Sequence, residues 1–164
     1  MRFLIVLLAL SVTGCDLLPQ SRLERIKDEG VLRVLTRNSG TTYYEGPYGP
    51  TGIEYDLALG FANSLGVRLE LEVPDSLSQI LEKIRAGEAD IAAAGLTVTD
   101  ERKAVLDFST GYQRITPQLV YRVGIRMPKN LNDLNGNLEV VANSSHAERL
   151  RSLREEYPNL SFQE

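Results

Sequence analysis

The sequence predicts an α/β fold built around a parallel sheet, because strand and helix patterns alternate between Val31 and Ala94. The 164 residues suffice for one domain or two small lobes. Hydrophobic residues make up 43% and charged residues 24%, a balance typical of a folded globular chain.

The first elements follow a short polar stretch. Residues 21–29 have a helical pattern that ends at Gly30, a residue that commonly stops helices. Residues 31–36 are rich in branched side chains and are predicted to form a strand. Residues 37–52 hold four glycines and two prolines and are predicted to form a loop.

Two helix–strand repeats come next. In residues 54–65 apolar side chains recur at helical spacing, and Gly66 ends the pattern. Residues 67–73 alternate apolar and charged side chains, as a strand with one solvated face does. A second helix is predicted between an N-cap at Ser76 and a stop at Gly87, before a short strand over residues 90–94.

The second half of the chain has fewer elements. Strands are predicted over residues 118–123, 138–142 and 160–163, with a short turn or helix over residues 131–135. Ser144 or Ser145 is expected to cap a helix that runs to about residue 156, and Ser145 with Glu148 fits a capping box. One helix and two strands cannot close a core, so we expect an incomplete second lobe.

Composition excludes several classes of function. Eighteen basic against 22 acidic residues leave a net charge of −4, which disfavours a nucleic-acid partner. A single Cys and a single His exclude an internal disulfide, a cysteine-based zinc cluster and a multi-histidine metal site. We therefore expect no metal and no cofactor.

The amino terminus has the pattern of a secretory signal. Residues 1–14 combine a basic Arg2, a short apolar run and small residues, and the only cysteine follows as Cys15. This resembles a bacterial lipobox, which implies that Cys15 is lipidated and anchors the protein in the envelope facing the periplasm. An ordinary secretion signal is the alternative. We expect the outer membrane, although Asp16 resembles an inner-membrane retention signal.

Residues 93–109, AAGLTVTDERKAVLDFS, carry the most specific pattern. They resemble the Gly-x-Thr-x-Thr loop, Arg and Phe-Ser pair of the family 3 periplasmic solute-binding proteins. The similarity runs from Gly30 to the end of the chain and implies a type 2 periplasmic-binding fold of two lobes with parallel or mixed sheets. The implied divisions are a signal peptide (1–14), a tether with a short helix (15–29), lobe 1 (30–117), a hinge strand (118–124) and a partial lobe 2 (125–164).

A carboxylate-bearing ligand suits the residues of this stretch. Arg102 offers a planar pair of donors, Thr97 a hydroxyl, and Gly95 a backbone that can approach closely. By resemblance these three residues hold the α-carboxylate of an amino acid or peptide. The alternative is that Thr99 only caps a helix and Arg102 is solvated.

Further contacts are implied by position. Tyr43 or Tyr44 occupies the place of the family's aromatic platform, with a core-covering role as the alternative. Ser144 and Ser145 begin a helix whose N–H groups would face the ligand. The family usually has Ser-Gly-Thr here, whereas this chain has Asn143 before the two serines.

Several segments of the first 122 residues, among them the Tyr43-Tyr44-Glu45-Gly46 stretch, resemble the opening of the F-type membrane-bound lytic murein transglycosylases. In that family a solute-binding-like module precedes a lytic domain whose catalytic Glu belongs to a Glu-Ser pair. No Glu-Ser pair occurs in this sequence, so no catalytic residue is assigned and contact with peptidoglycan would depend on a missing domain.

The resemblance implies a regulatory module that senses an amino acid or murein stem peptide. Two alternatives stay open. One is a lipid-anchored amino-acid receptor of an ABC importer, and the other is a decayed fragment without a stable fold. The intact mass of the natural product would distinguish a long lytic enzyme from a receptor.

Overall fold

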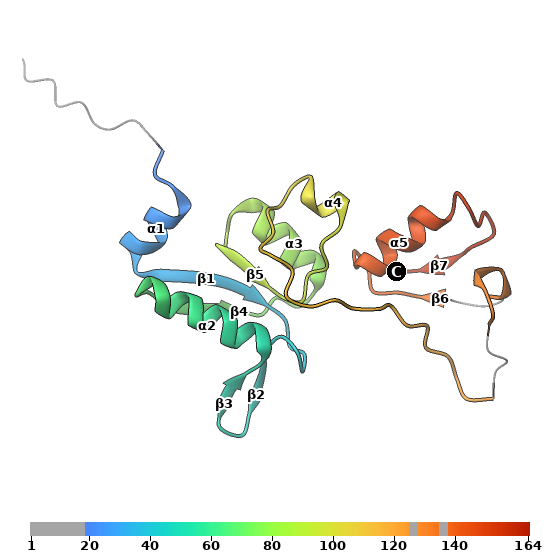
Figure 1. Ribbon diagram of the computed structural model, residues 1–164, viewed down its shortest axis with the longest axis horizontal. Helices are drawn as coiled ribbons and strands as arrows, with labels where there is room; N and C mark the ends of the chain where they lie inside the picture. The colour runs from blue at the N-terminus through green and yellow to red at the C-terminus, as the bar shows by residue number, and fades with distance from the viewer. Residues whose placement is uncertain (1–18, 125–127, 135–137) are drawn as a thin grey trace, which may run out of the picture.

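The structure is a computed structural model that describes residues 19–124, 128–134 and 138–164. Its centre is a parallel sheet in which β1 (Val31–Thr36) lies between β4 (Arg68–Glu72) and β5 (Ile91–Ala93). The three strands run in one direction, so their carboxyl ends share one edge of the sheet (Figure 1). The predicted parallel α/β sheet is confirmed.

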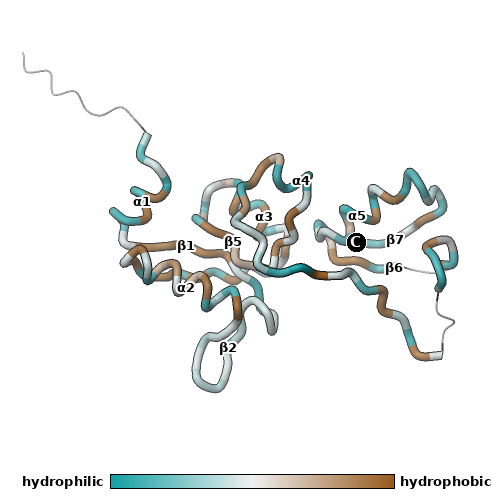
Figure 2. Tube along the Cα trace, in the orientation of Figure 1, coloured by the Kyte–Doolittle hydropathy of each residue, from teal (hydrophilic) through white to brown (hydrophobic). Residues whose placement is uncertain are grey.

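Helices cover both faces of this sheet. The helices α1 (Arg22–Glu29) and α2 (Ile53–Leu65) pack on one face, and α3 (Leu77–Ala86) packs on the other. Alternate residues of a strand face opposite sides, so β1 contributes to two cores. The first core comprises Ile26, Leu32, Val34, Ala58 and Ala62, and the second comprises Leu35, Ile80, Ala89 and Ala94. Figure 2 shows the hydrophobic character of β1 between these layers.

The helix ends follow the predicted signals. The Ser21 hydroxyl accepts the Glu24 N–H at 3.2 Å while the Glu24 carboxylate accepts the Ser21 N–H at 2.8 Å, which completes a capping box. Ser76 caps α3 as predicted, by accepting the Gln79 N–H at 3.2 Å. Gly30 follows α1 with a φ of 68°, in the left-handed region that glycine adopts without strain.

The loop predicted over residues 37–52 contains a hairpin, so the prediction was wrong for its second half. The strand β2 (Tyr44–Gly46) pairs antiparallel with β3 (Gly49–Thr51) across a two-residue turn. Each strand has three residues, which is too short for alternation to be visible in the sequence. Gly52 then enters α2 so close to Thr42 that an added Cβ would lie 2.2 Å from the Thr42 carbonyl oxygen.

The hinge strand predicted over residues 118–124 is not formed. After the short helix α4 (Asp100–Lys103), residues 106–122 contain neither helix nor strand, and Val120 and Val123 are almost fully exposed. A strand needs a neighbour to accept and donate its backbone hydrogen bonds, and no described strand lies beside this segment. The branched side chains of this segment favour a strand, but no strand forms because no neighbouring strand pairs with it.

The last described parts of the chain, residues 128–134 and 138–164, are together called here the carboxy-terminal unit. It contains a 3₁₀ turn (Leu131–Asp133), and β6 (Leu138–Glu139) pairs parallel with β7 (Phe162–Gln163) beside α5 (Ser145–Leu153). Ser144, not Ser145, caps α5, and the expected Ser145–Glu148 capping box is wrong. The Glu148 side chain turns away from its own helix to reach Arg102.

Asp90 ties α1 to the sheet. Its side chain is 1% exposed and accepts the Arg33 N–H at 2.9 Å and the Arg25 guanidinium at 3.0 Å. A second guanidinium, that of Arg22, lies 3.4 Å away. A buried carboxylate is stable only where such donors surround it.

Replacing Asp90 with Ala is expected to lower the free energy of unfolding by about 2 to 3 kcal/mol, because the buried Arg33 N–H loses its acceptor. The loss stays below that of a fully buried ion pair because both arginines are partly exposed and can turn to water. Urea denaturation measures the change. Asp107→Ala, at an exposed position, is the control, and equal stability of the two variants would contradict the role of Asp90.

Candidate functional site

The loop after β5 lies at the carboxyl edge of the sheet, where open α/β sheets bind their ligands. It runs from Gly95 to Thr99, whose hydroxyl caps α4 by accepting the Arg102 N–H at 3.3 Å. Only 5% of Arg102 is exposed. The alternative of a solvated Arg102 is therefore wrong, although the helix cap beside it does form.

Glu54 holds this loop in place. It belongs to the sheet unit, the name used here for the parallel sheet and its helices over residues 21–103. Gly95 has a φ of 65°, and its N–H donates to the Glu54 carboxylate at 2.6 Å. This left-handed backbone conformation favours glycine, and a Cβ on Gly95 would also lie 3.3 Å from the end of the Arg37 side chain, which would have to shift slightly. Glu54 is buried in the first turn of α2, where the helix dipole favours a carboxylate.

Tyr112 donates its hydroxyl to the same Glu54 carboxylate. Partial burial of the phenol, together with this hydrogen bond, raises the pKa of Tyr112. The phenol therefore remains protonated near neutral pH and continues to donate. This hydrogen bond connects residues 106–122, the segment without helix or strand, to the first turn of α2.

Arg102 joins the sheet to the carboxy-terminal unit. Its Nε donates to Glu148 Oε1 at 2.9 Å, and its Nη2 lies 2.9 Å from the same oxygen. The remaining hydrogen bonds go to the carbonyl oxygens of Thr97 at 3.1 Å and Asn143 at 3.0 Å. All three guanidinium nitrogens thus have partners within the chain.

The two serines at the start of α5 have different surroundings. The Ser145 hydroxyl lies 3.1 Å from the Thr97 hydroxyl, so these two predicted site residues are in direct contact. Ser144 is buried, and its hydroxyl accepts the Ala147 N–H at 3.2 Å. Asn143 takes a φ of 55°, a left-handed conformation that Asn tolerates better than most residues with a side chain.

The two predicted platform tyrosines point to different neighbours. The Tyr43 ring packs against Tyr55 with ring centroids 6.0 Å apart, and its hydroxyl donates to Glu45. Tyr44 lies in β2 and is 39% exposed. No hydrogen bond among the described residues joins either tyrosine to Arg102 or Thr97, so the structure brings together the loop, the arginine and the serines without them.

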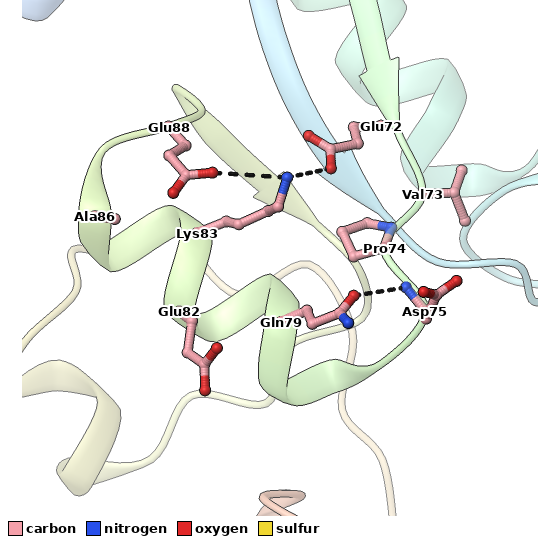
Figure 3. Close-up of a pocket in the computed structure, with 9 residues that line it drawn as sticks. All are labelled: Glu72, Val73, Pro74, Asp75, Gln79, Glu82, Lys83, Ala86 and Glu88. Carbon is pink, nitrogen blue, oxygen red and sulfur yellow. Dashed lines mark hydrogen bonds and ion pairs between the residues drawn. The ribbon is translucent and has the colours of Figure 1, made fainter.

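A cavity of about 270 Å³ lies beside Arg102, between α3, α4 and α5. Its polar lining includes Ser78, Glu82, Arg85, Glu101, Arg102, Asn143, Glu148 and Arg151. A larger open groove of about 560 Å³ lies between the end of β4 and α3 (Figure 3). Its lining stays acidic, because Lys83, which pairs with Glu72 and Glu88, is the single basic residue there, and only Glu82 lines both hollows. The cavity beside Arg102 has three arginines in its lining and is therefore the better candidate for a carboxylate-bearing ligand.

Some expectations concern residues that the structure does not describe. Cys15 and the signal segment lie outside the described residues. In the described part of the chain, no helix has the length and apolar character needed to cross a membrane. Nor do three His, Cys, Asp or Glu side chains gather there as metal ligands would.

The comparison with known families agrees with this geometry. The model of the bacterial extracellular solute-binding proteins, family 3, matches residues 32–159. The chain belongs to this family. Its members' description implies a location in the cell envelope or outside the cell.

Curated relatives extend the assignment. The chain is 48% identical over 148 residues to membrane-bound lytic murein transglycosylase F 1 of Alkalilimnicola ehrlichii, which covers 89% of this chain and 30% of the relative. It is 45% identical over 143 residues to the transglycosylase F of Saccharophagus degradans, with coverages of 87% and 28%. The family 3 chain thus spans about 30% of the length of these relatives.

Solved structures share the fold. An amino acid ABC transporter substrate-binding protein from Streptococcus pneumoniae, bound to L-arginine, matches with a TM-score of 0.72 and 30% identity over 88% of this chain and 61% of that one. An ancestral amino acid-binding protein, a precursor of cyclohexadienyl dehydratase, matches with a TM-score of 0.69 and 29% identity over 87% and 64%. The predicted periplasmic-binding fold, here a partial domain, is confirmed.

Sequence reasoning missed the two carboxylates of the site. Glu54 begins the helix predicted over residues 54–65, and its place in the first turn of that helix was the available signal. Glu148 was assigned to a capping box, because its spacing from Ser145 fits that local pattern equally well. Only the packing of α5 against the loop reveals its partner.

Replacing Glu54 with Ala is expected to release the Gly95 N–H, since that partly buried donor loses its acceptor. Hydrogen exchange at Gly95 should become faster by an amount equivalent to about 1 to 3 kcal/mol of lost protection. Asp56→Ala, an exposed carboxylate in the same helical turn, is the control. Unchanged exchange at Gly95 would show that Glu54 does not hold the loop.

Proposed function

We propose that this chain is the ligand-sensing module of a membrane-bound lytic murein transglycosylase and that it binds an amino acid or a murein stem peptide. The observation that carries the proposal is the meeting of Thr97, Arg102 and Ser145 at the carboxyl edge of the sheet. The relatives' names support the murein assignment, and the arginine-bound structural neighbour supports a ligand of amino-acid type.

The proposed contacts follow from the chemistry of a carboxylate. Arg102 would receive it as a planar pair of donors, with Thr97, the Gly95 backbone and the N–H groups at Ser144 and Ser145 around it. Tyr43 and Tyr44 would contribute from the first loop and the hairpin. The two lobes would close on the ligand about residues 118–124. Ligand would favour the closed form, because only there does it contact both the loop of lobe 1 and the start of α5 in lobe 2.

Sensing would modulate cleavage of the glycan by parts of the protein outside the matched segment. The relatives are more than three times the length of the match, which leaves room for such a domain. In this proposal the module itself has no catalytic residue, and it contacts peptidoglycan only through its ligand and its attached domain.

A second candidate is a lipid-anchored amino-acid receptor of an ABC importer. The Streptococcus pneumoniae neighbour has that class of function and the same fold. Tight binding of one free amino acid without affinity for stem peptides would favour this candidate.

Isothermal titration calorimetry with L-arginine, L-glutamine and a murein tripeptide tests the proposal. Binding of at least one probe is expected, and Arg102→Ala should weaken it by about 10- to 100-fold, the value of a charge-assisted hydrogen bond. Arg68→Ala, at the amino end of β4 and thus at the opposite edge of the sheet, should bind as the natural chain does. Equal affinity in the Arg102 and Arg68 variants would refute the role of Arg102.

We also propose that Cys15 is lipidated and holds the module in the envelope, with the outer membrane expected. Cys15→Ser should move the protein from the membrane fraction to the soluble periplasmic fraction. The serine variant cannot carry the acyl chains that anchor the proposed lipoprotein in the membrane. Fractionation followed by intact-mass measurement checks this. A membrane-bound serine variant, or a natural protein without acyl mass, would contradict it.

A further inference from the structure

The guanidinium of Arg102 is occupied in the unliganded chain by a carboxylate of the chain itself. Glu148 reaches it from the first turns of α5, and both Nε and Nη2 of Arg102 lie 2.9 Å from Glu148 Oε1. The side chains of the pair are 6% and 12% exposed. A carboxylate therefore already lies where the proposed function would place that of a ligand.

This pairing uses only half of the Glu148 carboxylate. Both contacts converge on Oε1, while Oε2 is buried and has no hydrogen-bond partner among the described residues. A bidentate arrangement, in which each carboxylate oxygen faces one guanidinium nitrogen, is the stronger geometry. A free ligand could adopt it, whereas Glu148 is constrained by its helix.

Glu148 also brings the two parts of the site together without a ligand. Besides the ion pair, Arg102 donates to the Asn143 carbonyl and Ser145 contacts Thr97. Asn143 donates in turn to Ser78 of α3 at 2.8 Å. The carboxy-terminal unit thus lies against the sheet unit through contacts that centre on Arg102.

We propose that Glu148 is a built-in competitor for Arg102, a latch that an incoming carboxylate must displace. This inference rests on the proposed function and adds its regulation. Displacement exchanges one charge-assisted pairing for a better one and frees the buried Oε2. For a ligand whose carboxylate binds Arg102, the latch would lower the apparent affinity in proportion to the fraction of the protein in which Arg102 is available.

The latch also sets a requirement on the ligand. A molecule with a free carboxylate can replace Glu148 at Arg102, whereas its amide has no charge with which to do so. The module would therefore respond to peptides with free carboxyl ends and discriminate against the same peptides when they are amidated.

Calorimetry on the protein at its natural length compares the natural sequence with Glu148→Gln, a variant of the same size without the charge. The probes are L-arginine, L-glutamine and a murein tripeptide, each beside its carboxyl-terminal amide. If the latched form makes up about nine-tenths of the unliganded protein, the carboxylate probes should bind the variant about tenfold more tightly. The amides should bind both proteins equally.

Glu155→Gln is the matched control, because Glu155 is an exposed carboxylate just after the same helix, lines neither hollow and forms no ion pair with the described residues. Thermal melting establishes that each variant is folded. Equal or weaker carboxylate binding by Glu148→Gln, or an equal gain for carboxylates and amides, would overturn the latch. Binding of no probe to either protein would overturn the proposed ligand class and the latch with it.

Discussion

Two hydrogen bonds between Arg33 and Asp90, one of them to the Asp90 side chain, place β5 beside β1, and the rest of the structure depends on this placement. The Arg33 N–H donates to the Asp90 carboxylate and the Asp90 N–H donates to the Arg33 carbonyl, both at 2.9 Å. Since β5 has only three residues, its own ladder is short. The loop that begins at Gly95 leaves β5 directly, so the position of the candidate site follows from this register.

The candidate site is held together by buried charged side chains. Glu54 holds the loop from within the sheet unit, and Arg102 connects that loop to the carboxy-terminal unit. Each buried charge is tolerable only with partners, because an unpaired one would lose several kcal/mol of hydration. In the proposed latch such a site changes state by exchanging partners, with Glu148 and the ligand carboxylate pairing with Arg102 in turn.

Local signals predicted most of the sheet unit. The predicted cap at Ser76 and the stops at Gly30, Gly66 and Gly87 are correct, because they depend on interactions within one turn of the chain. The hairpin in residues 44–51 and the missing strand in residues 118–123 were not predictable in the same way. A strand forms only where a neighbour completes its hydrogen bonds, and the sequence does not display that neighbour.

The sequence by itself determined the family and the parallel α/β layout, and it supplied the residues of the proposed carboxylate site, since periodicity, caps and the motif over residues 93–109 are encoded locally. Only the tertiary structure decided which of these residues meet. It joined Thr97 to Ser145 and Arg102 to Glu148, across 48 and 46 residues of chain respectively, and it placed Glu54 beneath Gly95. Contacts between residues so far apart in the sequence depend on how helices pack on a sheet. That packing follows from the burial of apolar side chains over the whole unit and not from any local pattern.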